Sequence, residues 1–292
     1  MTCASGPGAE VSGPLAILCG GGAFPLEVAG ETRRAGREPF LVGVVGVTDP
    51  GIEAYPHVWV RMGEVGKLFA ALKGRSIAEM VLIGAMTRPE FAALRFDWGA
   101  VKRAPELAQL FRRGDNGLLG GIASIIEREG LRIVGAHEIA PRLLAPVGRI
   151  GARAPSADDE TDIALGARLL AALSAFDIGQ GAIIAAGRVL AIEAAEGTDA
   201  MLARVAEMRS SGRVRLSGLA GVLVKAPKQG QDLRFDMPAI GPKTIEGAAK
   251  ARLRGAALAA GQVLIVERER CAREADAAGL FVAGFAHAIP AG

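Results

Sequence analysis

The first half of the chain alternates short, continuously apolar runs with longer segments of helical periodicity. Apolar runs of four to eight residues are typical of strands that are covered on both faces, as in parallel sheets. The pattern predicts strands at 15–19, 39–45, 57–60, 79–84 and 132–135, and helices at 24–34, 66–74 and 115–129. This alternation favours an α/β domain of the Rossmann-like type, with a parallel sheet and helices on its faces.

The second half has a different pattern. The apolar runs 181–185 and 188–192 flank the dipeptide Ala186-Gly187, which favours a tight hairpin. Helices are expected at 161–173, 198–210 and 244–259, and further strands at 221–224 and 262–266. Because hairpin and helical signals are mixed here, we expect a mixed α/β domain.

Between these two patterns, residues 148–162 are rich in Gly, Pro and Ser and end in four acids, Asp158, Asp159, Glu160 and Asp162. At 292 residues the chain is long enough for two cores. We therefore expect a flexible leader at 1–14, a Rossmann-like domain at 15–150, a linker at 151–162, and a mixed α/β domain at 163–292.

Composition narrows the classes of function. The net charge of +3 argues against a dedicated nucleic-acid-binding protein. Cys3, Cys19 and Cys271 lie far apart and form neither a disulfide framework nor a zinc motif, which favours a reducing, cytoplasmic compartment. His57 and the other two histidines are scattered, without the spacing of a metal site or a catalytic triad. No apolar run approaches the roughly 20 residues of a membrane span.

A glycine-rich turn, Gly20-Gly21-Gly22, joins the first strand to the first helix. Backbone N–H groups at such a helix start bind anions, so Gly21, Gly22 and Phe24 are candidates for contact with phosphate. The alternative is a merely tight turn. A nicotinamide-dependent oxidoreductase is disfavoured, because Pro25 replaces the third fingerprint glycine and no acid ends the second strand.

Two other sites in the first half carry polar groups. Thr87 and Arg88 follow the strand at 79–84, at the sheet edge where ligands of α/β proteins bind. The alternative interpretation is a helix cap and a surface cation. Asp115 is expected to cap the following helix, and that is favoured over phosphate binding by the adjacent arginines.

The most unusual segment is the loop 225–244, which follows the strand at 221–224. Three prolines exclude a continuous helix. Two carboxylates, Asp232 and Asp236, lie among four cations, Lys225, Lys228, Arg234 and Lys243. Cations that hold phosphate oxygens and carboxylates that hold a metal or orient water are the parts that phosphoryl transfer requires. The alternative is a solvated loop with incidental ion pairs.

Polar residues also gather where the hairpin begins and ends. Gln180 precedes it, and Glu193 and Glu196 follow it. Thr198 is a candidate helix N-cap, and Asp199 suits a first helical turn. The two glutamates have no such structural reason.

Five motifs together resemble the UDP-2,3-diacylglucosamine pyrophosphatases of the LpxI type, from the lipid A pathway of Gram-negative bacteria. They are CGGGAFP at 19–25, GAMTRP at 84–89, FDIGQ at 176–180, AIEAAEGTD at 191–199 and DLRFDMPAIG at 232–241. The resemblance implies hydrolysis of the UDP-sugar pyrophosphate with Mg²⁺, giving UMP and 2,3-diacylglucosamine 1-phosphate (lipid X). It also implies two domains that hold the substrate between them, a homodimer, and a cytoplasmic protein in peripheral contact with the inner membrane surface.

With this resemblance, Asp236 is the leading catalytic or metal-binding carboxylate and Asp232 the second, with Lys225 and Arg234 as further catalytic candidates. The expected substrate contacts are Gly21, Gly22, Phe24, Thr87, Arg88, Gln180, Glu193, Glu196, Gly197, Thr198, Asp199, Lys228, Lys243 and Thr244. The alternative from another class is a non-catalytic protein that binds a nucleotide-sugar or an acylated sugar. Release of UMP separates the two.

Overall fold

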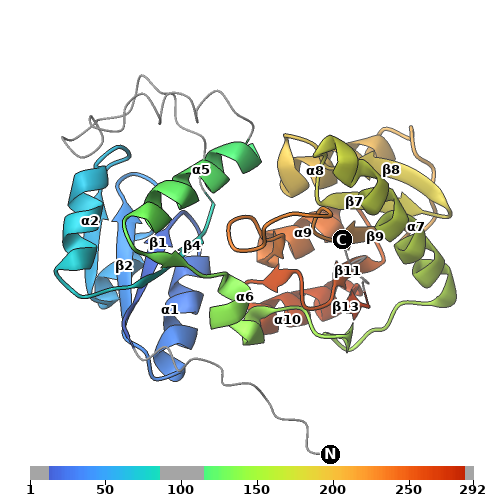
Figure 1. Ribbon diagram of the computed structural model, residues 1–292. Helices are drawn as coiled ribbons and strands as arrows, with labels where there is room; N and C mark the ends of the chain where they lie inside the picture. The colour runs from blue at the N-terminus through green and yellow to red at the C-terminus, as the bar shows by residue number, and fades with distance from the viewer. Residues whose placement is uncertain (1–12, 86–114, 287–292) are drawn as a thin grey trace, which may run out of the picture. The chain divides into compact units, whose positions relative to one another are not determined.

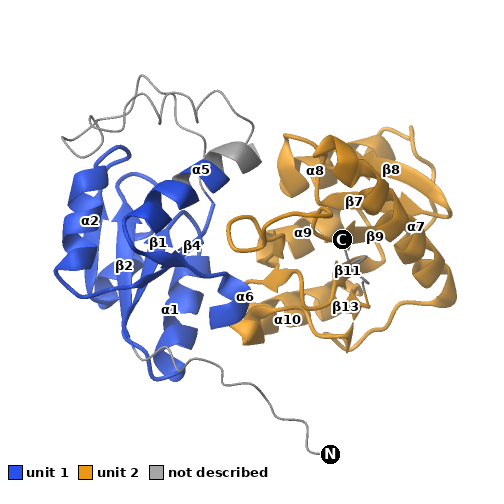
Figure 2. Ribbon diagram, in the orientation of Figure 1, with its two compact units in different colours: residues 1–139 blue, residues 140–292 orange. Residues whose placement is uncertain are grey.

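The chain forms two compact units, residues 1–139 and 140–292, each with its own sheet (Figure 2). The computed structural model describes residues 13–85 and 115–286. Most of the expected leader, the candidate contacts Thr87 and Arg88, the arginines before Asp115, and His287 lie outside the described residues. The units divide after Ile139, some ten residues before the expected boundary.

Unit 1 is built on a five-stranded sheet in the order β3-β2-β1-β4-β5, and every neighbouring pair is parallel (Figure 1). This confirms the Rossmann-like prediction. The central strands carry fully buried side chains such as Leu15, Ile17 and Leu41, because helices cover the sheet. The elements are β1 (Leu15–Cys19), α1 (Phe24–Arg34), β2 (Pro39–Val44), η1 (Pro50–Ala54), β3 (His57–Val60), α2 (Val65–Lys73), β4 (Glu79–Ile83), α5 (Asp115–Arg128), β5 (Arg132–Ile133) and α6 (Ala136–Ile139).

Unit 2 contains a six-stranded mixed sheet in the order β6-β13-β11-β9-β7-β8. Strands β9, β11 and β13 are parallel, whereas β6, β7 and β8 each run antiparallel to a neighbour. The mixed α/β prediction is therefore confirmed. The elements are η3 (Pro141–Leu143), β6 (Gly148–Arg149), α7 (Ala157–Leu173), η4 (Ser174–Phe176), β7 (Gly181–Ala185), β8 (Arg188–Ile192), α8 (Gly197–Ser210), β9 (Val222–Lys225), β10 (Ala239–Ile240), α9 (Pro242–Lys250), β11 (Gly255–Ala259), β12 (Leu264–Ile265), α10 (Arg268–Ala278) and β13 (Phe281–Phe285).

The acidic segment expected as a linker is, from Ala157 on, the start of α7. Ser156 accepts a hydrogen bond from the Asp159 N–H, and the Asp159 carboxylate accepts one from the Ser156 N–H, which is a capping box. Acids in a first helical turn also interact favourably with the helix dipole. The acids that suggested a flexible segment are therefore a helix-start signal.

The expected helix at 244–259 is wrong in its second half, because Gly255–Ala259 is strand β11. Four of its five residues are alanine or glycine, which carry no strand signal. The segment lies between β9 and β13, and all five residues are buried. Burial between two strands overrides the helix propensity of alanine. The following α10 and β13 were not predicted from the sequence.

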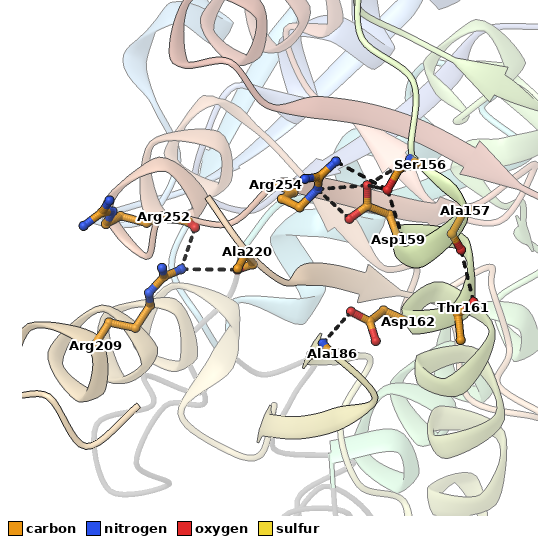
Figure 3. Close-up of polar contacts among 10 residues, drawn as sticks. All are labelled: Ser156, Ala157, Asp159, Thr161, Asp162, Ala186, Arg209, Ala220, Arg252 and Arg254. Atoms are coloured by element: carbon orange, nitrogen blue, oxygen red, sulfur yellow. Dashed lines mark hydrogen bonds and ion pairs between the residues drawn. The ribbon is translucent and has the colours of Figure 1, made fainter. Parts of the chain in front are cut away.

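At the amino ends of the parallel strands, Arg254 and Asp159 join β11 to α7 (Figure 3). The Arg254 Nε lies 2.8 Å from the Asp159 Oδ1, and Asp159 is buried. One turn further along α7, Asp162 accepts the N–H groups of Ala186 and Gly187 at 2.9 and 2.7 Å. Ala186 and Gly187 have φ of 51° and 72°, so the hairpin turn predicted here is confirmed.

Arg209, near the end of α8, donates to five backbone carbonyl oxygens, those of Ala220, Ala251, Arg252, Leu216 and Gly218. These contacts join the loop after α8 to the end of α9, as Figure 3 shows for two of the carbonyls. No helix within 13–85 or 115–286 is long and apolar enough to cross a membrane.

Candidate functional site

Lys225 is the last residue of β9 and is only 3% exposed. Its Nζ lies 3.3 Å from the Glu193 Oε2 and donates to the Thr198 Oγ1. The Thr198 hydroxyl in turn donates to the Glu193 Oε1 at 2.9 Å. The three side chains therefore form a closed group between the end of β9, the end of β8 and the start of α8.

This group corrects the expected N-cap. Glu196 occupies the N-cap position of α8, although its side chain makes no capping hydrogen bond. Thr198 is already the second residue of the helix. The Thr198 hydroxyl is directed instead to Lys225 and Glu193. A predicted capping residue therefore belongs to the candidate site.

Asp236 is held by two amide side chains from different segments. The Gln180 Nε2 donates to the Asp236 Oδ2 at 2.9 Å, and the Gln231 Nε2 donates to the same oxygen at 2.5 Å. Within the described ranges, the Asp236 Oδ1 has no hydrogen-bond partner. One oxygen of this carboxylate is thus fixed by the protein and the other is available.

The loop that carries Asp236 is tied to the segment before β7 at three further points. Lys228 pairs with Asp177, the Gln229 N–H donates to the Ser174 Oγ at 2.9 Å, and the Ala226 N–H donates to the Gln180 carbonyl at 3.0 Å. The expected site loop is therefore an ordered structure and not an unattached loop.

Asp232 has a different environment. Its carboxylate receives two bonds from the Arg234 Nε, at 3.0 and 3.1 Å, and one from the Arg234 Nη2 at 2.7 Å. The Arg234 guanidinium also lies 4.8 Å from the centre of the Phe235 ring. Both charged side chains are at least 40% exposed, so this pair is an open ion pair at the surface.

The remaining candidates of unit 2 are not brought into these contacts. Glu196, the N-cap residue of α8, pairs with Arg204 of that helix at 2.8 Å. Asp199 is exposed in the first turn of α8, and Lys243 is exposed in the first turn of α9. Thr244 is buried and accepts the Gly241 N–H at 3.4 Å, which is a helix-start contact. Gly197 begins α8 with a φ of 79°.

In unit 1, the glycine-rich turn has a packing reason. A Cβ added to Gly20 would lie 2.6 Å from the backbone of Gly84. Gly21 donates to the Ala85 carbonyl at 2.7 Å, and Ala85 donates back to Gly21 at 2.9 Å. The N–H groups of Gly20 and Gly21 are thus used inside the protein, and Gly22, with a φ of 89°, is exposed. Their contact with phosphate stays a prediction.

Cys19 directly precedes this turn but is not suited to nucleophilic chemistry. Burial raises the pKa of its thiol to about 12, and the Sγ donates to the Ile17 carbonyl at 3.2 Å. At neutral pH the side chain is a neutral thiol and not a thiolate.

The residue that sequence reasoning missed is Gln231, which lies directly before Asp232. A neutral amide in a polar loop has no distinguishing sequence pattern, whereas charged side chains among prolines and glycines stand out. The role of Gln231 depends on where the loop turns back, and this turn includes the hydrogen bond from the Asp236 N–H to the Asp232 carbonyl at 3.3 Å.

Comparison with known proteins agrees with the two-unit architecture. The LpxI N-terminal domain model matches residues 14–143, and the LpxI C-terminal domain model matches residues 146–283. The UDP-2,3-diacylglucosamine pyrophosphatase LpxI of Caulobacter vibrioides is 41% identical over 270 residues, which cover 92% of this chain and 96% of that protein. The resemblance drawn from the five motifs is confirmed, and the chain belongs to the LpxI family.

Proposed function

We propose that this protein hydrolyses the pyrophosphate of UDP-2,3-diacylglucosamine to UMP and 2,3-diacylglucosamine 1-phosphate. The activity named for the Caulobacter relative supports this substrate. The observation that carries the chemistry is the Asp236 carboxylate, which is fixed through Oδ2 and has no partner for Oδ1 among residues 13–85 and 115–286, in a loop that also contains Lys228 and Arg234.

In the proposed reaction, the oxygen of a water molecule bonds to one phosphorus and the bridging P–O bond breaks. Two phosphate monoesters leave, and the proton lost by the water passes to a base. The Asp236 Oδ1 has no hydrogen-bond partner within the described ranges, so it is suited to accept this proton or to orient the water. Nearby cations offset the negative charge that grows on the phosphate oxygens.

We also propose that Mg²⁺ takes part. Among the described residues, no three His, Cys, Asp or Glu side chains gather into a metal cage. Mg²⁺ is, however, commonly held by one or two carboxylates together with substrate phosphates, so Asp236 fits such a donor set. Asp232 is a weaker fit, because Arg234 occupies both of its oxygens. When bound, the ion would neutralise phosphate charge and polarise the bond that breaks.

The roles of the cations differ. The Arg234 side chain is 40% exposed and that of Lys228 is 13% exposed, and they pair with Asp232 and Asp177, whose side chains are 44% and 57% exposed. We propose that the two cations exchange these exposed partners for phosphate oxygens. Lys225 is buried against Glu193 and Thr198. We propose that it positions these two candidate substrate contacts, since a direct phosphate contact would require it to leave Glu193.

The deciding experiment follows the ³¹P NMR spectrum of UDP-2,3-diacylglucosamine incubated with the protein and Mg²⁺. Appearance of UMP and a sugar 1-phosphate supports the hydrolase. Intact substrate that nevertheless binds supports the alternative, a non-catalytic carrier. Undiminished turnover in excess chelator would remove the metal from the proposal and leave the hydrolase.

The homodimer and the peripheral contact with the inner membrane surface stay proposals that rest on family resemblance, and the cytoplasmic location is a proposal that also rests on the cysteine pattern. Size-exclusion chromatography with light scattering measures the mass of the protein in solution. Flotation with phospholipid vesicles, with and without the acylated substrate, measures membrane contact. A monomeric mass or a protein that stays at the bottom of the gradient would contradict the respective proposal.

A further inference from the structure

We infer that Gln231 is a positioning residue for the proposed reaction, because it fixes the rotation of the Asp236 carboxylate. The expected effect on turnover rests on the proposed function, whereas the contact between Gln231 and Asp236 rests on the geometry alone. No role has been assigned to this amide by the sequence motifs or by the family match.

The orientation of the Gln231 amide is determined by its neighbours. Its Oε1 accepts the Lys228 N–H at 2.8 Å, which identifies that end of the amide as the oxygen. Its Nε2 then faces Asp236, donating to the backbone carbonyl at 2.6 Å and to the Oδ2 at 2.5 Å. Both amide hydrogens are used, so Gln231 has no donor left for a ligand.

Gln180 differs in this respect. Its Nε2 has a single acceptor among the described residues, the Asp236 Oδ2 at 2.9 Å. A second amide hydrogen and the Oε1 have no partner in the described part of the chain and can serve a ligand, as the predicted substrate contact requires. The two amides therefore share one oxygen of Asp236 but have separate tasks. Gln231 acts only through Asp236, and Gln180 has groups to spare.

The consequence is that the Asp236 carboxylate cannot rotate freely. Two N–H donors on the Oδ2 make that oxygen a poor partner for a metal or a water. They also hold the Oδ1 in one place, and pre-organisation of this kind lowers the cost of reaching the transition state. Loss of Gln231 should therefore reduce kcat much more than it raises KM, since the substrate contacts themselves remain.

The activity test compares Gln231→Leu with Gln229→Leu. Leucine keeps the approximate size of Gln231 and removes its donors, and kcat is expected to fall at least about tenfold with KM changed less than about threefold. Gln229 of the same loop is the matched control, because its side chain is exposed and, among the described residues, it bonds only through its backbone N–H, to the Ser174 Oγ. Equal rates for the two variants would overturn the positioning role.

A second measurement does not depend on turnover. In protein labelled with ¹⁵N-glutamine, the side-chain amide protons of Gln231 are expected to exchange slowly with solvent. Exchange should accelerate several-fold in Asp236→Ala and stay unchanged in Asp232→Ala. Equal exchange in all three proteins would show that the contact does not exist. If the contact is present but the wild-type protein releases no UMP, the proposed function fails and the geometric inference stands.

Discussion

The Nζ of Lys225 lies 3.3 Å from the Oε2 of Glu193, and the two side chains are 4% and 12% exposed. Only three residues further along the chain, Glu196 pairs with Arg204 at 2.8 Å, but there the side chains are 33% and 49% exposed. One short segment thus contains a buried and an exposed ion pair. Their energetic consequences should differ, because a charge left unpaired in the interior is not solvated.

We expect Lys225→Met to destabilise unit 2 by about 3 kcal/mol, since it leaves the Glu193 carboxylate without its cation. The double variant Lys225→Met/Glu193→Gln should recover part of this loss. Arg204→Met is the control for the exposed pair and should cost at most about 1 kcal/mol. Urea unfolding followed by circular dichroism measures all three. Equal losses for Lys225→Met and Arg204→Met would contradict the burial argument.

The second prediction separates the two aspartates of the loop. Asp236→Ala should reduce turnover by at least about a hundredfold, a common scale for loss of a general base, while the substrate still binds. Asp232→Ala should have a smaller effect, because Asp232 is engaged by Arg234 and is not held by the amide groups. Steady-state kinetics and calorimetric binding measure the two effects. An inactive Asp232→Ala variant together with an active Asp236→Ala variant would contradict the assignment of Asp236 as the catalytic carboxylate.

The third prediction concerns the close approach of Gly179 to the hairpin. A Cβ added there would lie 1.9 Å from the Glu193 carbonyl oxygen, and Gly179 also has a φ of 57°. Gly179→Ala should therefore cost at least about 2 kcal/mol and disturb both Gln180 and Glu193.

Gly230 is the matched control, because it has a φ of 73° but open space around the added Cβ. Gly230→Ala isolates the backbone strain and should cost about 1 kcal/mol. Thermal unfolding of both variants gives the comparison. A Gly179→Ala protein as stable as Gly230→Ala would show that the hairpin moves aside without penalty.

The sequence predicted those parts of the fold whose signal is local. Strands such as Leu15–Cys19 are continuous runs of apolar residues, and Gly187 of the Ala186-Gly187 turn readily adopts the positive φ that a tight hairpin requires. The strand Gly255–Ala259 has no such signal, because alanine and glycine do not favour strands. These residues are buried because β11 lies between β9 and β13. Its position is a consequence of tertiary packing.

The same distinction applies to the candidate site. Lys225, Asp232 and Asp236 were identifiable as charges in an irregular loop, but their partners were not. Asp232 faces Arg234 two residues away, whereas Asp236 faces Gln180 from a segment 56 residues earlier. Charge patterns along the chain indicate which residues are available. Only the fold determines which of the two carboxylates is fixed by neutral donors from elsewhere.

The last prediction concerns the need for both units. Each has its own sheet and buried core, so residues 1–139 and 140–292 should fold when expressed separately. A cut near Ser156 would prevent unit 2 from folding as a whole, because residues 140–155 also belong to unit 2. Leu144 pairs with Leu264, and β6 pairs with β13.

Neither half is expected to release UMP, because the candidate carboxylate Asp236 belongs to unit 2 and the glycine-rich turn to unit 1. Circular dichroism of each half checks folding, and the phosphorus assay checks activity with the full chain as the reference. If unit 2 alone turns over the substrate at the rate of the full chain, the glycine-rich turn has only a structural role, which is to form the hydrogen bonds between Gly21 and Ala85. Inactive but folded halves would instead require a contribution of unit 1 to the chemistry or to substrate binding.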